Sequence, residues 1–255
     1  MTLQTQLLIE QKLAWTPVAG LVFCSTLFLY ALHRIVGLFK VQNFTDKGRY
    51  QVISKFKSHI IIYAILAGIG SAYYFFQTSL EVQLSLIIPG IISLAYVLPF
   101  LNGKKRLRDL GTIKIFLISI VWAWVTVGLP ALEMNEIRDP AIWFMAIERA
   151  LFIFAITLPF DIRDLKVDAH NDVSTIPAKI GIEKTKRLAT LILIAMVIFV
   201  NINYQIGFYS KPASLALLIS VISTYFLIQY SDKDQHDYFY TGAMDGTMIL
   251  QFLLV

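Results

Sequence analysis

Long apolar runs are the feature that most restricts how this chain folds. Runs of about 20 apolar residues recur along the whole sequence, and a helix of that length crosses the hydrocarbon core of a bilayer. Backbone N–H and C=O groups find no water inside lipid, so each run has to bond its own backbone as a helix. Charged residues make up 15% of the chain, against about 25% in an ordinary soluble domain. We therefore expect an all-α fold, a polytopic transmembrane helical bundle.

The apolar runs predict eight membrane spans. They cover residues 17–36, 58–76, 80–101, 112–132, 140–160, 187–207, 212–230 and 238–255. Residues 1–16 are too short to cross a bilayer. No polar segment between the spans is long enough for a separate soluble domain, so we expect one integral membrane domain over residues 1–255.

Basic residues are distributed unequally between the two sides of these spans. The loops after the first, third, fifth and seventh spans, together with Arg34, Lys114 and Arg187 at the adjoining span ends, hold 18 of the 22 Lys and Arg residues. The positive-inside rule assigns these loops to the cytoplasm. The net charge of +5 then indicates anionic headgroups and an anionic substrate, because the basic residues gather between spans. We expect no nucleic-acid partner.

Carboxylates gather in one stretch, between Phe160 and Pro177. On a helix that turns by about 100° per residue, Asp161, Asp164, Asp168 and Asp172 fall within an arc of about 80°. Four such charges repel one another unless cations lie among them or some stay protonated. Hard divalent cations suit these oxygen ligands, and Mg²⁺ shared with a phosphate-bearing substrate is the usual case. The alternative is a solvated acidic helix face.

Basic loops on the same predicted side supply the complementary charge. Lys104 and Lys105 follow the third span, and Arg34 ends the first. Carboxylates for Mg²⁺ beside Lys and Arg are what a diphosphate group requires, and a cavity within the membrane would suit a long apolar tail. The pattern therefore indicates a polyprenyl diphosphate. The alternative is that these loops only set topology and contact lipid headgroups.

Two motifs resemble those of a known family. The spacing Asp161-x-x-Asp164-x-x-x-Asp168, with Ser174-Thr175-Ile176-Pro177 and Gly181 after it, resembles the second aspartate-rich motif of the UbiA-type membrane prenyltransferases. The run from Tyr96 to Pro99 before the basic loop is similar to that family's Tyr-x-x-Pro run. The resemblance implies nine helices around a central cavity and Mg²⁺-dependent ionisation of an allylic diphosphate. It also implies transfer of the prenyl group to an aromatic or other lipid-soluble acceptor.

The helical face, the basic residues and the resemblance together predict roles for individual residues. Asp161, Asp164 and Asp168 would act in catalysis and bind the metal, with Asp172 as a further metal ligand. The expected substrate-binding residues are Tyr30, His33, Arg34, Tyr96, Lys104 and Lys105. The family's first aspartate-rich motif is missing, since residues 29–37 contain no carboxylate. His33 and Arg34 could bind diphosphate directly in its place, or Tyr30 and His33 could simply lie at the membrane interface.

The missing motif leaves other functions open. One is a membrane terpene cyclase of the same fold, and another is a non-catalytic isoprenoid-binding membrane protein.

Glu148 and Arg149 lie within a predicted span, where a charge is costly. Each should therefore face a cavity or a partner, and Asp245 is a candidate partner for Arg149. We expect a bacterial plasma membrane as the location, with the Asp-rich and basic loops in the cytoplasm.

Overall fold

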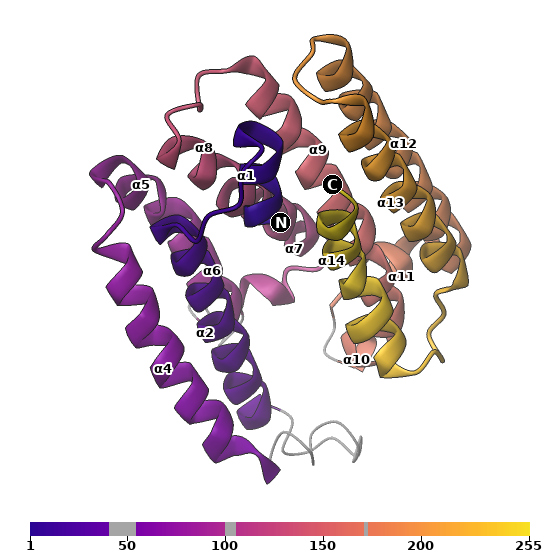
Figure 1. Ribbon diagram of the computed structural model, residues 1–255. Coiled ribbons are helices and arrows are strands. Elements are labelled where there is room, and N and C mark those ends of the chain that lie inside the picture. The colour runs from indigo at the N-terminus through magenta and orange to yellow at the C-terminus, as the bar shows by residue number, and fades with distance from the viewer. Residues whose placement is uncertain (41–54, 100–105, 171–172) are drawn as a thin grey trace. The chain divides into compact units, whose positions relative to one another are not determined.

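The structure is a computed structural model that describes residues 1–40, 55–99, 106–170 and 173–255 (Figure 1). Within these ranges the regular elements are all helices, so the all-α prediction is confirmed. Seven helical segments of the described chain are long and apolar enough to cross a membrane. The fold is that of a polytopic helical membrane protein.

Each of these seven segments corresponds to a predicted span. They are Pro17–Gly37, Lys57–Phe75, Leu80–Val97, Ile113–Glu133, Pro140–Arg163, Ile182–Gln205 and Lys211–Tyr230. The sixth begins at Ile182, five residues before its predicted start at residue 187. Its first turn contains Glu183 and Lys184, so hydropathy alone does not include this turn in the span. The predicted eighth span, residues 238–255, is not among the seven; there η3 (Phe239–Met244) runs directly into α14 (Asp245–Leu254).

The chain divides into two compact units, which we describe separately. The smaller unit is Trp15–Arg108, and the larger unit is Met1–Ala14 together with Asp109–Val255. The smaller unit contains α2 (Pro17–Lys40), α4 (Lys57–Phe75), α5 (Leu80–Ser85) and α6 (Ile87–Val97). The prediction of a single domain concerns both units together and stays a prediction.

In the smaller unit, α2 packs along α4 (Figure 1). Glycines permit this close approach: a Cβ on Gly20 of α2 would lie 2.5 Å from the ring of Tyr74, and one on Gly70 of α4 would lie 2.8 Å from the Cys24 sulfur. Small residues serve the same purpose in other pairs of membrane helices. The outer face of α4 exposes Ile65 and Leu66, as expected of a helix that contacts lipid.

The larger unit is built around one long helix, α9 (Pro140–Arg163). Its other elements are α1 (Thr2–Glu10), α7 (Ile113–Ala123), the π-helical η2 (Trp124–Gly128), α8 (Leu129–Glu133), α10 (Leu165–His170), α11 (Ile176–Ile180), α12 (Ile182–Gln205), α13 (Lys211–Tyr230), η3 and α14. Both α7 and α12 pack against α9 (Figure 1). Met145, Phe152 and Leu158 of α9 are completely buried, so this helix carries much of the unit's core.

Helix α9 begins at a side-chain cap and ends at a break in the helical backbone. At its start, the Asp139 carboxylate accepts a hydrogen bond from the Ala141 N–H at 2.8 Å, and Pro140 occupies the first helical position. At its end, the helix stops at Arg163, and Asp164 forms a one-residue break before α10. The aspartate-rich stretch therefore lies at the C-terminal end of the central helix.

Candidate active site

Backbone hydrogen bonds carry the helical path of α9 across its break into α10. The Asp164 N–H donates to the Phe160 carbonyl at 3.0 Å, and the Asp168 N–H donates to the Asp164 carbonyl at 2.8 Å. Both bonds have the spacing of an α-helix, so the face predicted for Asp161, Asp164 and Asp168 is largely preserved. Asp172, the fourth predicted carboxylate, lies outside the described residues.

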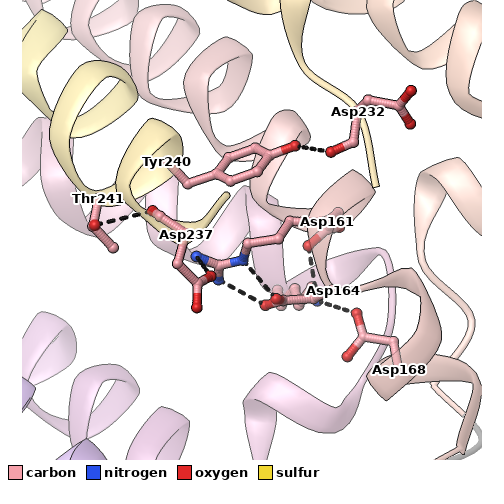
Figure 2. A network of polar contacts seen from close by, with 9 residues as sticks. Asp161, Asp164, Asp168, Asp232, Asp237, Tyr240 and Thr241 are labelled. Atoms are coloured by element: carbon pink, nitrogen blue, oxygen red, sulfur yellow. Dashed lines mark hydrogen bonds and ion pairs between the residues drawn. The ribbon is translucent and has the colours of Figure 1, made fainter. Parts of the chain in front are cut away.

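Lys114 of α7 holds two of these carboxylates together. Its Nζ lies 2.8 Å from Asp161 Oδ1 and 3.1 Å from Asp168 Oδ2. Asp161 is 3% exposed, Asp168 is 7% exposed and Lys114 is 5% exposed. The alternative of a solvated acidic face is therefore wrong for Asp161 and Asp168. Figure 2 shows the three Asp side chains with their ion pairs.

Asp164 is bound by a different cation, Arg163. The guanidinium donates from Nε to Asp164 Oδ1 at 2.8 Å and from Nη2 to Asp164 Oδ2 at 3.1 Å, a two-point contact that fixes the carboxylate plane. The same guanidinium lies 5.1 Å from the ring centre of Phe160 and 5.4 Å from that of Tyr240. Such contacts between a cation and aromatic rings are attractive.

The segment between α13 and η3 is joined to this network. Asp237 lies 3.8 Å from Arg163 Nη1, and the Tyr240 hydroxyl donates to the carbonyl of Asp232 (Figure 2). Asp234 forms a second, exposed ion pair with Lys166 of α10 at 3.1 Å. Residues 232–240 are thus tied to the break between α9 and α10.

A glycine sets the position of α7 beside the aspartates. Gly111 has φ +61°, and a Cβ there would lie 2.4 Å from the carbonyl oxygen of Ser174. Only glycine fits both the backbone conformation and this close approach. Since Lys114 follows within one helical turn, the contact between Gly111 and Ser174 helps to place its ammonium beside Asp161 and Asp168.

The carboxylates provide ligands that suit Mg²⁺. Asp161 Oδ2 is buried and has no hydrogen-bond partner, so this oxygen of Asp161 is unused. Among the described residues, no group of three or more His, Cys, Asp or Glu side chains could hold a metal. Mg²⁺ commonly binds proteins through one or two carboxylates, with water and substrate phosphates completing its six ligands. Asp161 and Asp168 fit this pattern.

Four of the predicted substrate-binding residues are described, and all four belong to the smaller unit. Tyr30, His33 and Arg34 lie on α2, and Tyr96 lies on α6. Tyr30 and Arg34 are exposed, whereas His33 is partly buried and hydrogen-bonds through Nε2 with Arg108 Nη1. The end of the first span and the segment after the third therefore meet within this unit. Lys104 and Lys105 lie outside the described residues.

A second buried polar group occurs elsewhere on α9. Glu148 Oε2 accepts a hydrogen bond of 2.9 Å from the Tyr209 hydroxyl, in the turn between α12 and α13. Burial raises the pKa of the Tyr209 phenol well above its usual range, and the nearby Glu148 carboxylate raises it further, so the phenol stays a donor. Arg149 donates to the Met1 carbonyl at 3.3 Å rather than to Asp245, the predicted partner. These contacts indicate a structural role.

Sequence reasoning missed Lys114 and Arg163 as parts of the site. In the sequence, both belong only to the basic residues that predict topology. Lys114 carries a recognisable signal, since it lies one residue inside an apolar helix, where an ionisable side chain usually has a functional partner. Nothing in the local sequence identifies that partner, because Asp168 is 54 residues away along the chain.

The helices of membrane length define an integral membrane protein. Its polar site is formed by the buried carboxylates at the end of the central helix, α9. The model of the UbiA prenyltransferase family matches residues 53–252, so the chain belongs to this family. A solved structure from work on the biosynthesis of "Digeranylgeranylglyceryl phosphate synthase in membranes" aligns over 99% of this chain and 89% of that chain. The TM-score is 0.64 at 14% sequence identity, which is a likeness of fold. None of the curated protein sequences matches.

Proposed function

We propose that the protein transfers a prenyl group, within the membrane, from a polyprenyl diphosphate to a lipophilic acceptor. The observation that carries this proposal is the buried pair of Asp161 and Asp168, held at one ammonium with an unused carboxylate oxygen. Membership of the UbiA prenyltransferase family supports the same reaction class. Ionisable side chains buried in a membrane helix commonly mark a functional site, which favours the same reading.

In this reaction the bond between the allylic carbon and the diphosphate oxygen breaks, and its electron pair leaves with pyrophosphate. An acceptor then bonds to the allylic carbon and gives up a proton. Asp161 and Asp168 would hold Mg²⁺, which when bound neutralises the charge of the leaving group. Lys114 holds both carboxylates at one point, and Arg163 fixes the plane of the Asp164 carboxylate.

The proposal names the acceptor by its chemical class and not as a particular compound. Aromatic acceptors follow from the family resemblance. The similar solved structure concerns a digeranylgeranylglyceryl phosphate synthase, and that name describes a glyceryl phosphate lipid. Lipid alcohols therefore belong beside aromatic compounds in any panel of acceptors.

The experiment supplies purified protein with Mg²⁺, allylic diphosphates of several chain lengths, and both classes of acceptor. Pyrophosphate release and lipid products are measured for wild type, Asp161→Asn and Asp168→Asn. Removing one group that binds the charged leaving group should lower the rate about 100-fold or more. Glu183→Gln is the matched control, because its carboxylate is 78% exposed and pairs with Lys186 on its own helix. Turnover that stays unchanged in both Asp variants would reject the proposal.

A second candidate function, isoprenoid binding without catalysis, is favoured by one observation. In the stretch where the family has its first aspartate-rich motif, the chain has His33 in contact with Arg108 and no carboxylate. Diphosphate binding without pyrophosphate release, at every chain length, would support this candidate. Release of pyrophosphate without an acceptor, with a cyclised hydrocarbon as product, would instead identify a terpene cyclase.

A further inference from the structure

Lys114 is a charge buried in an apolar helix. It is the second residue of α7, it is 5% exposed, and the next residue, Ile115, is completely buried. An ammonium in such surroundings is costly unless a carboxylate accompanies it. Here two carboxylates do so, Asp161 at 2.8 Å and Asp168 at 3.1 Å.

The charges of this cluster do not cancel. Two carboxylates and one ammonium leave one net negative charge, and Asp161 Oδ2 is buried without a partner. The ammonium reduces the repulsion between the carboxylates when no other cation is present. It also lies at the point where both carboxylates converge, which is the position that a shared metal ion would take.

A divalent cation that arrives alone therefore meets an unfavourable site. The ammonium repels the cation and already uses one oxygen of each carboxylate. A cation that arrives with a diphosphate meets different conditions. Phosphate oxygens can accept hydrogen bonds from the Lys114 ammonium, and their negative charge offsets the added positive charge.

We propose that Lys114 is a resident cation that competes with divalent metal for Asp161 and Asp168. It keeps the metal affinity low in the free protein and lets the metal enter together with a diphosphate. This inference rests on the proposed function, since it assumes that the aspartate pair receives a metal diphosphate. Coupling of this kind is reciprocal, so metal and diphosphate each raise the affinity of the other.

The test measures two binding constants in each purified variant. The first is the affinity for Mn²⁺ alone, from electron paramagnetic resonance of the free ion. The second is the affinity for labelled inorganic pyrophosphate at saturating Mg²⁺. In Lys114→Met we expect Mn²⁺ to bind about tenfold more tightly than in wild type, and pyrophosphate with Mg²⁺ about tenfold more weakly.

The opposite directions of these changes separate the proposal from a purely structural role. A lysine that only stabilises the fold would, when removed, weaken both affinities or neither. The matched control is Lys166→Met, because Lys166 lies in the same stretch but is 73% exposed and pairs with Asp234. We expect it to leave both constants unchanged.

Two further measurements keep the test decisive if Lys114→Met does not fold. Lys114→Gln removes the charge but leaves an amide that can donate to the carboxylates, and it should shift both constants in the same directions. The wild-type protein itself should bind Mn²⁺ far more weakly alone than with pyrophosphate. Wild type that binds Mn²⁺ equally well in both conditions, or Lys114 variants with unchanged Mn²⁺ affinity, would overturn the inference.

The outcome is separable from that of the proposed function. If no allylic diphosphate releases pyrophosphate but the Lys114 variants show the two opposite shifts, the reaction is rejected and the resident cation stands. If prenyl transfer is observed and the shifts are not, the reaction stands and the role of Lys114 is rejected.

Discussion

At the scale of single residues, Gly111 and Gly181 offer a controlled comparison. Both have positive φ, at +61° and +83°, which disfavours any residue with a Cβ. Only Gly111 also faces a neighbour, the Ser174 carbonyl, whereas a Cβ on Gly181 would meet nothing within 4 Å. Gly111 therefore combines a restricted backbone with the contact that places α7 beside the aspartate stretch, whereas Gly181 has a restricted backbone without such a contact.

We predict that Gly181→Ala lowers the free energy of unfolding by about 1–3 kcal/mol, because φ +83° with ψ 163° is a backbone conformation essentially confined to glycine. Gly111→Ala should cost about 1–3 kcal/mol more, because the methyl group displaces the Ser174 backbone. Thermal unfolding in detergent measures both. Equal losses in the two variants would show that the contact between Gly111 and Ser174 contributes nothing.

At the scale of elements, two basic residues join the end of α9 and α10 to the segment before η3. Arg163 contacts Asp164, Asp237 and two aromatic rings with a side chain that is 11% exposed. Lys166 pairs with Asp234 of the same segment, but its side chain is 73% exposed. Burial should decide their importance, because exposed ion pairs contribute about 0–1 kcal/mol.

We predict that Arg163→Lys weakens the attachment of residues 232–240 by about 2 kcal/mol, because lysine cannot make the two-point contact with Asp164. Hydrogen exchange of these amides should accelerate, while exchange in α4 stays unchanged. Lys166→Ala is the control and should alter exchange little. Acceleration that is as large in Lys166→Ala as in Arg163→Lys would contradict this account.

At the scale of the whole molecule, the distribution of charge predicts the orientation in the membrane. The connection that begins with the aspartate stretch and ends at α12 is rich in Lys and Arg, whereas the turn after Glu133 holds one basic residue, Arg138. The positive-inside rule then places Glu183 on the cytoplasmic side and Glu136 on the opposite side. Both side chains are exposed in the structure.

Cysteine labelling tests this orientation. The chain has a single cysteine, Cys24, so Cys24→Ser provides a background without thiols. In that background, a membrane-impermeant maleimide should label Glu136→Cys in right-side-out vesicles and Glu183→Cys only in inverted ones. The reverse pattern would place the aspartate stretch outside the cytoplasm and contradict the predicted topology.

The sequence by itself determined the spans and the helix that presents the aspartates. Lipid leaves the backbone no alternative to helix, so apolar length alone predicts eight spans, and seven of them, Pro17–Gly37 among them, are helices of membrane length in the described chain. Helical periodicity likewise predicts a common face for Asp161, Asp164 and Asp168, and the backbone bonds continue across the break at Asp164. These are local properties, and each can be read from neighbouring residues.

Only the tertiary structure decided which cations those aspartates meet. Lys114 reaches Asp168 across 54 residues of sequence, and Arg163 contacts a ring of Tyr240 that belongs to another element. No local pattern encodes such pairs, because they depend on how α7, α9 and η3 pack. The four carboxylates predicted from periodicity thus become, in the folded chain, one pair held by Lys114 and one side chain held by Arg163, with Asp172 outside the described residues.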